Sequence, residues 1–197
     1  MRKDIILSGV GGQGILSIAA VIGEAALTEG LNIKQAEVHG MSQRGGDVHS
    51  NLRISSLPIF SDLISKGTAD VIISLEPMEA LRYLPYLSKE GWIIANAEPF
   101  KNIPNYPDAD ELIEELSALP HVILLHVDEI AKAEGIARAA NIVLLGAASV
   151  ILGIDYEALE KALHRIFGCK GGDVVEMNLK ALRAGYEAGV RQKEILA

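Results

Sequence analysis

The residues Gly9-Val10-Gly11-Gly12-Gln13-Gly14 have the types and spacing of a loop that holds an anion. They contain G-x-G-x-x-G, follow an apolar run and precede an Ala-rich stretch, which predicts a strand, a glycine turn and a helix. Glycine permits positive φ and close approach of the backbone, and a helix N-terminus offers unpaired amides. The candidate cofactor-binding residues are therefore Gly9, Gly11, Gly12, Gln13 and Gly14.

A second glycine-rich segment, Val-His-Gly-Met-Ser-Gln-Arg-Gly-Gly over residues 38–46, follows the next predicted strand. Arg44 carries a planar fork of donors that suits a phosphate or a carboxylate. A connector with three glycines has little to bury, so its chemistry is available to a partner or a ligand. We expect this loop to be functional surface and add Ser42, Gln43, Arg44, Gly45 and Gly46 to the candidate cofactor-binding residues.

Other side chains whose type could serve binding or catalysis have simpler interpretations. Glu37 stands where a dinucleotide fold places the acid that binds a ribose hydroxyl, or it is a polar residue at a strand end. His39 and His49 are expected to make ordinary hydrogen bonds, because no carboxylate or thiol spacing supports a metal site. Lys170 could lower the pKa of the Cys169 thiol, but a small residue in a tight connector is the simpler interpretation. We predict no catalytic residue and no metal ligand in this chain.

Composition restricts the class of protein. The 197 residues are 49% hydrophobic but include only three Phe, five Tyr and one Trp, so the core must be aliphatic, as in parallel α/β sheets. Eighteen basic against 26 acidic residues give a formal charge of −8, which argues against binding to nucleic acid or to an anionic membrane. A single cysteine cannot hold an iron–sulfur cluster or a structural zinc, and it fits a cytoplasmic location. No signal peptide or membrane-spanning run is recognised, since the apolar stretch 140–154 is too short.

Hydrophobic periodicity predicts one α/β domain over residues 1–197. It is Rossmann-like: a mostly parallel sheet with an antiparallel excursion, flanked by helices, and a helical C-terminal third from about residue 128. The expected strands are 5–7, 32–39, 48–55, 71–75, 92–95 and 122–126, with 58–60 as a hairpin return. The expected helices are 14–28, 77–87, 108–119, 128–135, 136–152, 155–167 and 174–192.

The two glycine motifs together resemble the gamma-type subunit family of 2-oxoacid:ferredoxin oxidoreductases. The loop 38–46 is most similar to the form in the beta subunit of the indolepyruvate type, since it lacks the Tyr-Gly and the acid usual in pyruvate-type members. The resemblance covers almost the whole chain, including residues 141–146 and 175–179.

This resemblance implies an enzyme that oxidatively decarboxylates a 2-oxoacid to an acyl-CoA and passes electrons to ferredoxin. The assembled enzyme would use thiamine diphosphate, iron–sulfur clusters and coenzyme A. This chain would be an accessory subunit, because it has one cysteine and lacks the Gly-Asp-Gly and Asn-Asn thiamine motif. Its implied partner is a catalytic alpha subunit that carries the thiamine and the clusters, and ferredoxin is reached through the complex.

Alternative functions stay open at the level of sequence. The chain could be the gamma subunit of a pyruvate, 2-ketoisovalerate or 2-oxoglutarate oxidoreductase. It could also be a Rossmann-type NAD(P)-binding dehydrogenase, or a non-catalytic sensor of a nucleotide or acyl-CoA. The absence of an acid/base constellation argues against an autonomous dehydrogenase, and the Arg-Gly-Gly loop favours the subunit.

Overall fold

The computed structural model describes residues 1–40, 46–101 and 103–196, and the side chain of His39 is outside this description. The strands are β1 (Arg2–Val10), β2 (Asn32–His39), β3 (Asp47–Ser55), β4 (Ala69–Ser74), β5 (Leu87–Asn96) and β6 (Val122–Leu125). The α-helices are α1 (Ile15–Thr28), α2 (Pro77–Arg82), α3 (Ala109–Ser117), α4 (Val127–Ala133), α5 (Ala140–Leu152), α6 (Tyr156–Phe167) and α7 (Gly172–Leu196). Three short 3-10 turns are η1 (Leu84–Tyr86), η2 (Ala137–Ala139) and η3 (Gly168–Lys170).

The strands form one sheet in the order β2-β3-β1-β4-β5-β6. Strands β1, β4, β5 and β6 are parallel to one another, whereas β3 is antiparallel to both β1 and β2. The predicted antiparallel excursion is therefore confirmed. It is the β2–β3 hairpin, and its second strand, β3, lies between β1 and β2.

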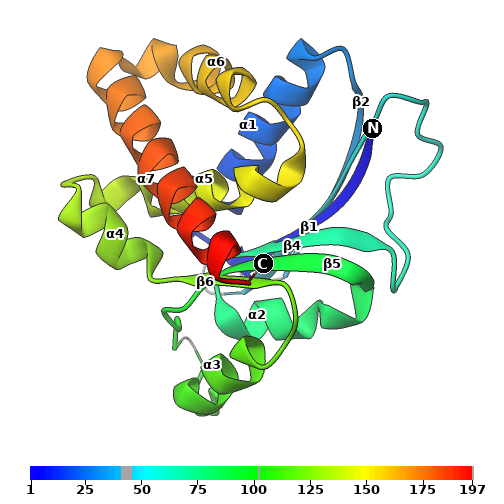
Figure 1. Cartoon of the computed structure of the whole chain (residues 1–197), viewed down its shortest axis with the longest axis vertical. Coiled ribbons are helices and arrows are strands. Elements are labelled where there is room, and N and C mark those ends of the chain that lie inside the picture. Colours follow the sequence, from blue (N-terminus) through cyan, green and yellow to red (C-terminus); the bar gives the residue numbers. More distant parts are fainter. Residues whose placement is uncertain (41–45, 102, 197) are drawn as a thin grey trace.

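Alternating side chains divide the core into two layers. Ile5, Leu7, Val71 and Ile73 face a large aliphatic cluster with helices α1, α4, α5, α6 and α7. Their neighbours Ile6 and Ile72, with Ile93 and Leu116, face a smaller cluster under α2 and α3. Figure 1 shows the same division, with α1, α5, α6 and α7 on one side of the sheet and α2 and α3 on the other. The helical C-terminal third covers the larger core, as the sequence predicts.

Several element boundaries differ from the sequence prediction. Residues 58–60 form no strand, because Pro58 lacks an amide donor and the following carbonyls of Ser61 and Leu63 bond to the Arg53 side chain. The predicted helix 136–152 is divided into η2 and α5. The predicted helix 77–87 is divided into α2 and η1, in agreement with the break that Pro85 indicates in the sequence. Within the described part of the chain, no helix is both long and apolar enough to cross a bilayer.

Candidate functional site

The glycine turn lies between β1 and α1, where the sequence places it. The Gln13 amide nitrogen donates to the Val10 carbonyl at 3.1 Å, which closes the turn. The Gln13 side chain accepts from the Val10 amide at 2.7 Å and donates to the Leu75 carbonyl at 3.1 Å. Gln13 thus ties the turn after β1 to the end of β4, and Gly9 is the penultimate residue of β1.

Gly12 is the residue of the turn that faces open space. Its φ is 103°, and a Cβ built there would meet no atom within 4 Å. Gly14 caps α1 with a φ of 92°, and no side chain caps this helix. The first amides of α1 are therefore available to an anion. Gly14 itself is held by a hydrogen bond, because the Asn141 side chain donates to its carbonyl at 3.3 Å.

The two glycine segments meet in the structure. The Gly11 amide donates to the Gly46 carbonyl at 2.9 Å, and the Gly40 amide donates to the Asp47 carbonyl at 2.9 Å. The base of the second loop is therefore closed and lies beside the glycine turn. The remaining predicted site residues of this loop, Ser42, Gln43, Arg44 and Gly45, lie outside the described residues, so their role stays a prediction.

A crevice of about 190 Å³ opens at the carboxyl ends of the parallel strands, beside the glycine turn. This edge is where open α/β sheets bind ligands. Its lining residues come from the glycine turn, the chain just after β4, the end of β5, the start of α4, η2 and the start of α5: Gln13, Leu75, Asn96, Val127, Asp128, Ala137, Arg138, Ala140 and Asn141. The N-terminus of α5 also lacks a side-chain cap. Two helix N-termini and the Arg138 guanidinium thus favour negative charge here.

Asn96 joins the strand ends that form this crevice. It is buried, and its side-chain oxygen accepts from the Val127 amide at 3.3 Å and from the Glu98 amide at 3.2 Å. Its side-chain nitrogen lies 3.4 Å from the Leu75 carbonyl and 3.3 Å from the Asp128 carboxylate. All four polar directions of the amide are used inside the protein, so Asn96 shapes the crevice.

An acidic group that the sequence analysis missed adjoins the lining residue Asp128. Burial, together with the adjacent Asp128 carboxyl, raises the pKa of Glu98 to about 7. Ligand atoms of Glu98, His126 and Glu129 lie within 4.8 Å of one another. Two of these three residues are exposed, and Lys132 already supplies a positive charge to the group, so we assign no metal to it. The available signal was that these acids follow the ends of two successive strands.

A second polar cluster lies under the base of the 40–46 loop. The Tyr83 hydroxyl is 2.9 Å from the Asp47 carboxylate and 2.6 Å from His49 Nδ1. Burial lowers the pKa of His49 and raises that of Glu79, the latter to about 7 despite the salt bridge from Arg82 at 2.7 Å. His49 therefore has an ordinary hydrogen-bond role, as expected.

The structure also separates Glu37 from the glycine turn. Strand β3 lies between β1 and β2, so Glu37 is two strand spacings, about 10 Å, away from β1. In a dinucleotide fold the acid stands on the strand next to β1. The arrangement needed for a ribose-binding acid is therefore absent at Glu37, which pairs with Gln35 at 2.6 Å.

Comparisons with known proteins agree with this geometry. The family model described as "Pyruvate ferredoxin/flavodoxin oxidoreductase" matches residues 4–188. The indolepyruvate oxidoreductase subunit IorB of Archaeoglobus fulgidus is 40% identical over 203 aligned positions, covering 96% of each chain. The pyruvate oxidoreductase subunit PORC of Thermotoga maritima has a similar fold, with a TM-score of 0.73, 23% identity, and coverage of 94% of this chain and 96% of that one.

A longer protein contains the same fold as one part. The 2-oxoglutarate:ferredoxin oxidoreductase of Magnetococcus marinus, solved with 2-oxoglutarate, coenzyme A and succinyl-CoA, matches 96% of this chain with a TM-score of 0.76 at 22% identity. This chain spans 31% of the length of that one. The family model and the full-length relatives lead to one conclusion: the chain belongs to the pyruvate ferredoxin/flavodoxin oxidoreductase family.

Proposed function

We propose that this chain is an accessory subunit of a 2-oxoacid:ferredoxin oxidoreductase, with indolepyruvate as the substrate. The observation that carries the proposal is the match over 96% of an indolepyruvate oxidoreductase subunit at 40% identity. In this reaction the C1–C2 bond of the 2-oxoacid breaks and CO₂ leaves. Two electrons pass to ferredoxin, and the acyl group joins the sulfur of coenzyme A.

The residues of this chain do not fit the redox and thiamine groups of such an enzyme. Cys169 is the single cysteine and is exposed in η3, so the chain cannot supply the thiolates of a cluster. The thiamine diphosphate and the clusters are therefore assigned to a larger partner subunit, which also contacts ferredoxin.

The crevice does fit the anionic part of coenzyme A. The open space at Gly12, the uncapped starts of α1 and α5, and the Arg138 side chain surround one edge of the sheet. A phosphate there would accept backbone amide hydrogen bonds and meet a guanidinium. We place the phosphate-bearing end of coenzyme A at this edge, with Arg44 of the adjoining loop as a further contact.

The first experiment separates a subunit from an autonomous enzyme. We expect the purified chain to oxidise no 2-oxoacid and to show no cluster absorbance after anaerobic reconstitution. Adding the larger subunit from the same source should restore indolepyruvate oxidation with ferredoxin as acceptor. Turnover by the chain alone would disprove the subunit assignment, and a preference for pyruvate, 2-ketoisovalerate or 2-oxoglutarate would correct the substrate.

The second experiment tests the crevice. Arg138→Gln removes the positive charge from an exposed position that lines the crevice. We expect the affinity of the complex for coenzyme A, measured by calorimetry, to fall by about tenfold. Arg191→Gln, on an exposed position of α7, is the matched control. Equal affinities of both variants would remove Arg138 from the site.

A further inference from the structure

The loop of residues 56–68 between β3 and β4 carries an unusual group of exposed apolar side chains. Leu57, Phe60 and Leu63 are 71%, 94% and 59% exposed. Of the described large apolar side chains, only Ile195, near the end of α7, matches this range at 83%. Three such side chains within seven residues mark an interaction surface more than scattered apolar residues do.

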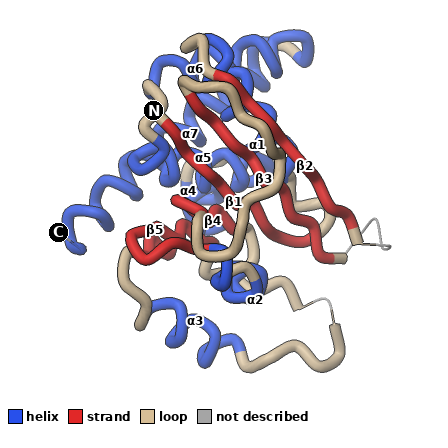
Figure 2. Tube along the Cα trace, turned by 90° about the vertical axis from the view of Figure 1, so that its right-hand side faces the viewer, coloured by secondary structure: helices blue, strands red, loops and turns tan. Residues whose placement is uncertain are grey.

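The loop is fixed to the sheet beneath it. Arg53 Nη1 donates to the carbonyls of Ser61 and Leu63 at 3.0 and 3.1 Å. The Ile64 amide donates to the Asn51 side chain at 3.1 Å, and Ile64 is buried. In Figure 2 this loop crosses in front of the sheet, on the side opposite α1. Because its backbone is already held, binding through its side chains costs little conformational entropy.

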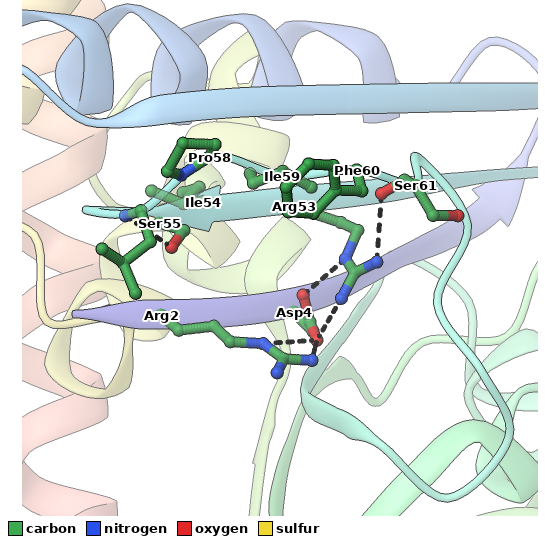
Figure 3. Close-up of a pocket in the computed structure, with 10 residues that line it drawn as sticks. Arg2, Asp4, Arg53, Ile54, Ser55, Pro58, Ile59, Phe60 and Ser61 are labelled. Atoms are coloured by element: carbon green, nitrogen blue, oxygen red, sulfur yellow. Dashed lines mark hydrogen bonds and ion pairs between the residues drawn. The ribbon is translucent and has the colours of Figure 1, made fainter.

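The loop forms one wall of a hollow of about 340 Å³, which also borders β1 and β3. Figure 3 shows Arg53 between Asp4 and Ser61, with Ile59 and Phe60 beside it. Arg53 and Arg2 both bind the buried Asp4 carboxylate, at 2.7 and 2.6 Å. The hollow is large enough for one large side chain, and its floor is polar but internally paired.

Two basic side chains lie on the face of the sheet that carries the hollow. The Arg2 side chain is 63% exposed although it contacts Asp4. Lys34 is exposed and pairs in register with Arg53, so it lies on the same face of the sheet. A complementary partner therefore offers an apolar side chain for the hollow and carboxylates for Arg2 and Lys34.

We infer that this surface, formed by Leu57, Phe60, Leu63, Arg2 and Lys34, docks the larger subunit of the oxidoreductase. The contact is a segment with an aromatic or branched apolar side chain flanked by Asp or Glu. The inference rests on the proposed function. It agrees with the longer Magnetococcus marinus protein, in which this fold is joined to other parts of one chain. A second copy fits less well, because a two-fold interface pairs this surface with itself, so each copy would bring the same two basic side chains, Arg2 and Lys34, into the contact.

The test compares Phe60→Ser with Leu27→Ser in the complex. Leu27 is 58% exposed on α1, which covers the opposite face of the sheet, so it is a matched control. We expect Phe60→Ser to raise the dissociation constant for the larger subunit by about 30-fold. Leu27→Ser should leave it unchanged, and both variants should melt within about 2 °C of the wild type, since exposed substitutions cost little stability.

Charge is tested with Arg2→Gln, which leaves Asp4 paired with Arg53. Its effect on the dissociation constant should be largest at low salt and shrink as salt rises. If the wild type binds the larger subunit and Phe60→Ser binds it with the same affinity, the docking surface is overturned but the proposed function is not. A wild-type dimer that Phe60→Ser converts to a monomer would also overturn it, in favour of a second copy. If the wild-type chain does not bind the larger subunit, the proposed function fails together with this surface.

Discussion

Two buried acidic side chains lie at the start of α2 and within it, and each needs a compensating partner. Glu76 is fully buried and caps α2 by accepting from the Glu79 amide at 3.0 Å. It also accepts from the Tyr106 hydroxyl and, at 3.3 Å, from the Phe100 amide. Three hydrogen bonds, one from α2 and two from residues that follow β5, thus stabilise one carboxylate and hold Phe100 and Tyr106 against the chain that follows β4.

Glu79 lacks such complete compensation and should therefore make stability depend on pH. Its folded-state pKa is about 7, above the ordinary 4.5, because burial and the Asp47 carboxyl oppose its ionisation. The folded state thus binds a proton more tightly than the unfolded state between these values. Stability from this group is present below pH 4.5 and is lost as pH rises through 7.

We expect Glu79→Gln to remove this loss. The free energy of unfolding of the wild type should fall relative to the variant by about 1–3 kcal/mol between pH 5 and 8. Chemical denaturation at several pH values measures the difference. Glu114→Gln, at an exposed position of α3, is the control and should keep the wild-type slope. If the free energy of unfolding of Glu79→Gln changes with pH as steeply as that of the wild type, Glu79 ionises normally.

At the scale of elements, helices α5 and α7 pack closely enough to exclude side chains at the contact. A Cβ added to Gly185 would lie 1.9 Å from the Val143 carbonyl oxygen, and one added to Gly146 would lie 2.1 Å from the Leu182 carbonyl oxygen. Both obstacles are backbone atoms, so neither can rotate away. The position of α5, whose N-terminus lines the crevice, therefore depends on glycine in α7.

Gly185→Ala should consequently separate these helices. We expect a loss of about 3 kcal/mol or more in the free energy of unfolding, because overpacking against backbone cannot relax locally. Thermal unfolding of the variant measures this loss. Gly168→Ala is the control, since its Cβ would meet nothing within 4 Å and its φ is ordinary. Equal melting temperatures would mean that α7 moves without cost.

The sequence predicted elements whose signals are local and missed contacts that depend on the tertiary arrangement. The glycine turn, α1, and the strands at 32–39 and 48–55 follow from glycine positions and alternation, and the structure confirms them. The antiparallel partners of the second of these strands are β1 and β2, whereas the sequence indicated residues 58–60. Gln13 was expected to contact a ligand, yet its side chain bonds Val10 and Leu75. Leu75 lies 62 residues from Gln13 in the chain, so no local pattern reports this pair.

The crevice shows the same limit of prediction from the sequence. Arg138 and Asn141 reach the glycine turn from more than 120 residues away in the chain, and Asn96 joins the ends of three strands. Hydrophobic periodicity places each element but not the polar groups at their ends. The expected hairpin return at 58–60 was wrong because the side chain of Arg53, and not a neighbouring strand, binds the carbonyls that follow it.

At the scale of the whole molecule, the two faces of the sheet are covered to different extents. One face is covered by α1 and the C-terminal helices, and its core is aliphatic. The other face has a smaller core under α2 and α3, together with the 56–68 loop. The proposed ligand crevice lies at the strand ends, and the proposed docking surface lies on the less covered face. The two proposed sites are therefore on separate surfaces of the molecule.

The insertion of β3 beside β1 also has a consequence for synthesis on the ribosome. The neighbours of β1 are β3 and β4, and both leave the exit tunnel after β2. In a simple βαβ unit the first forty residues would already contain two pairing strands. Here those residues contain β1 and β2, which do not pair with each other, so β1 has no partner strand until β3 emerges, starting with Asp47 opposite Val10 and ending with Ser55 opposite Arg2. Until then its apolar strand stays exposed to chaperones and to aggregation.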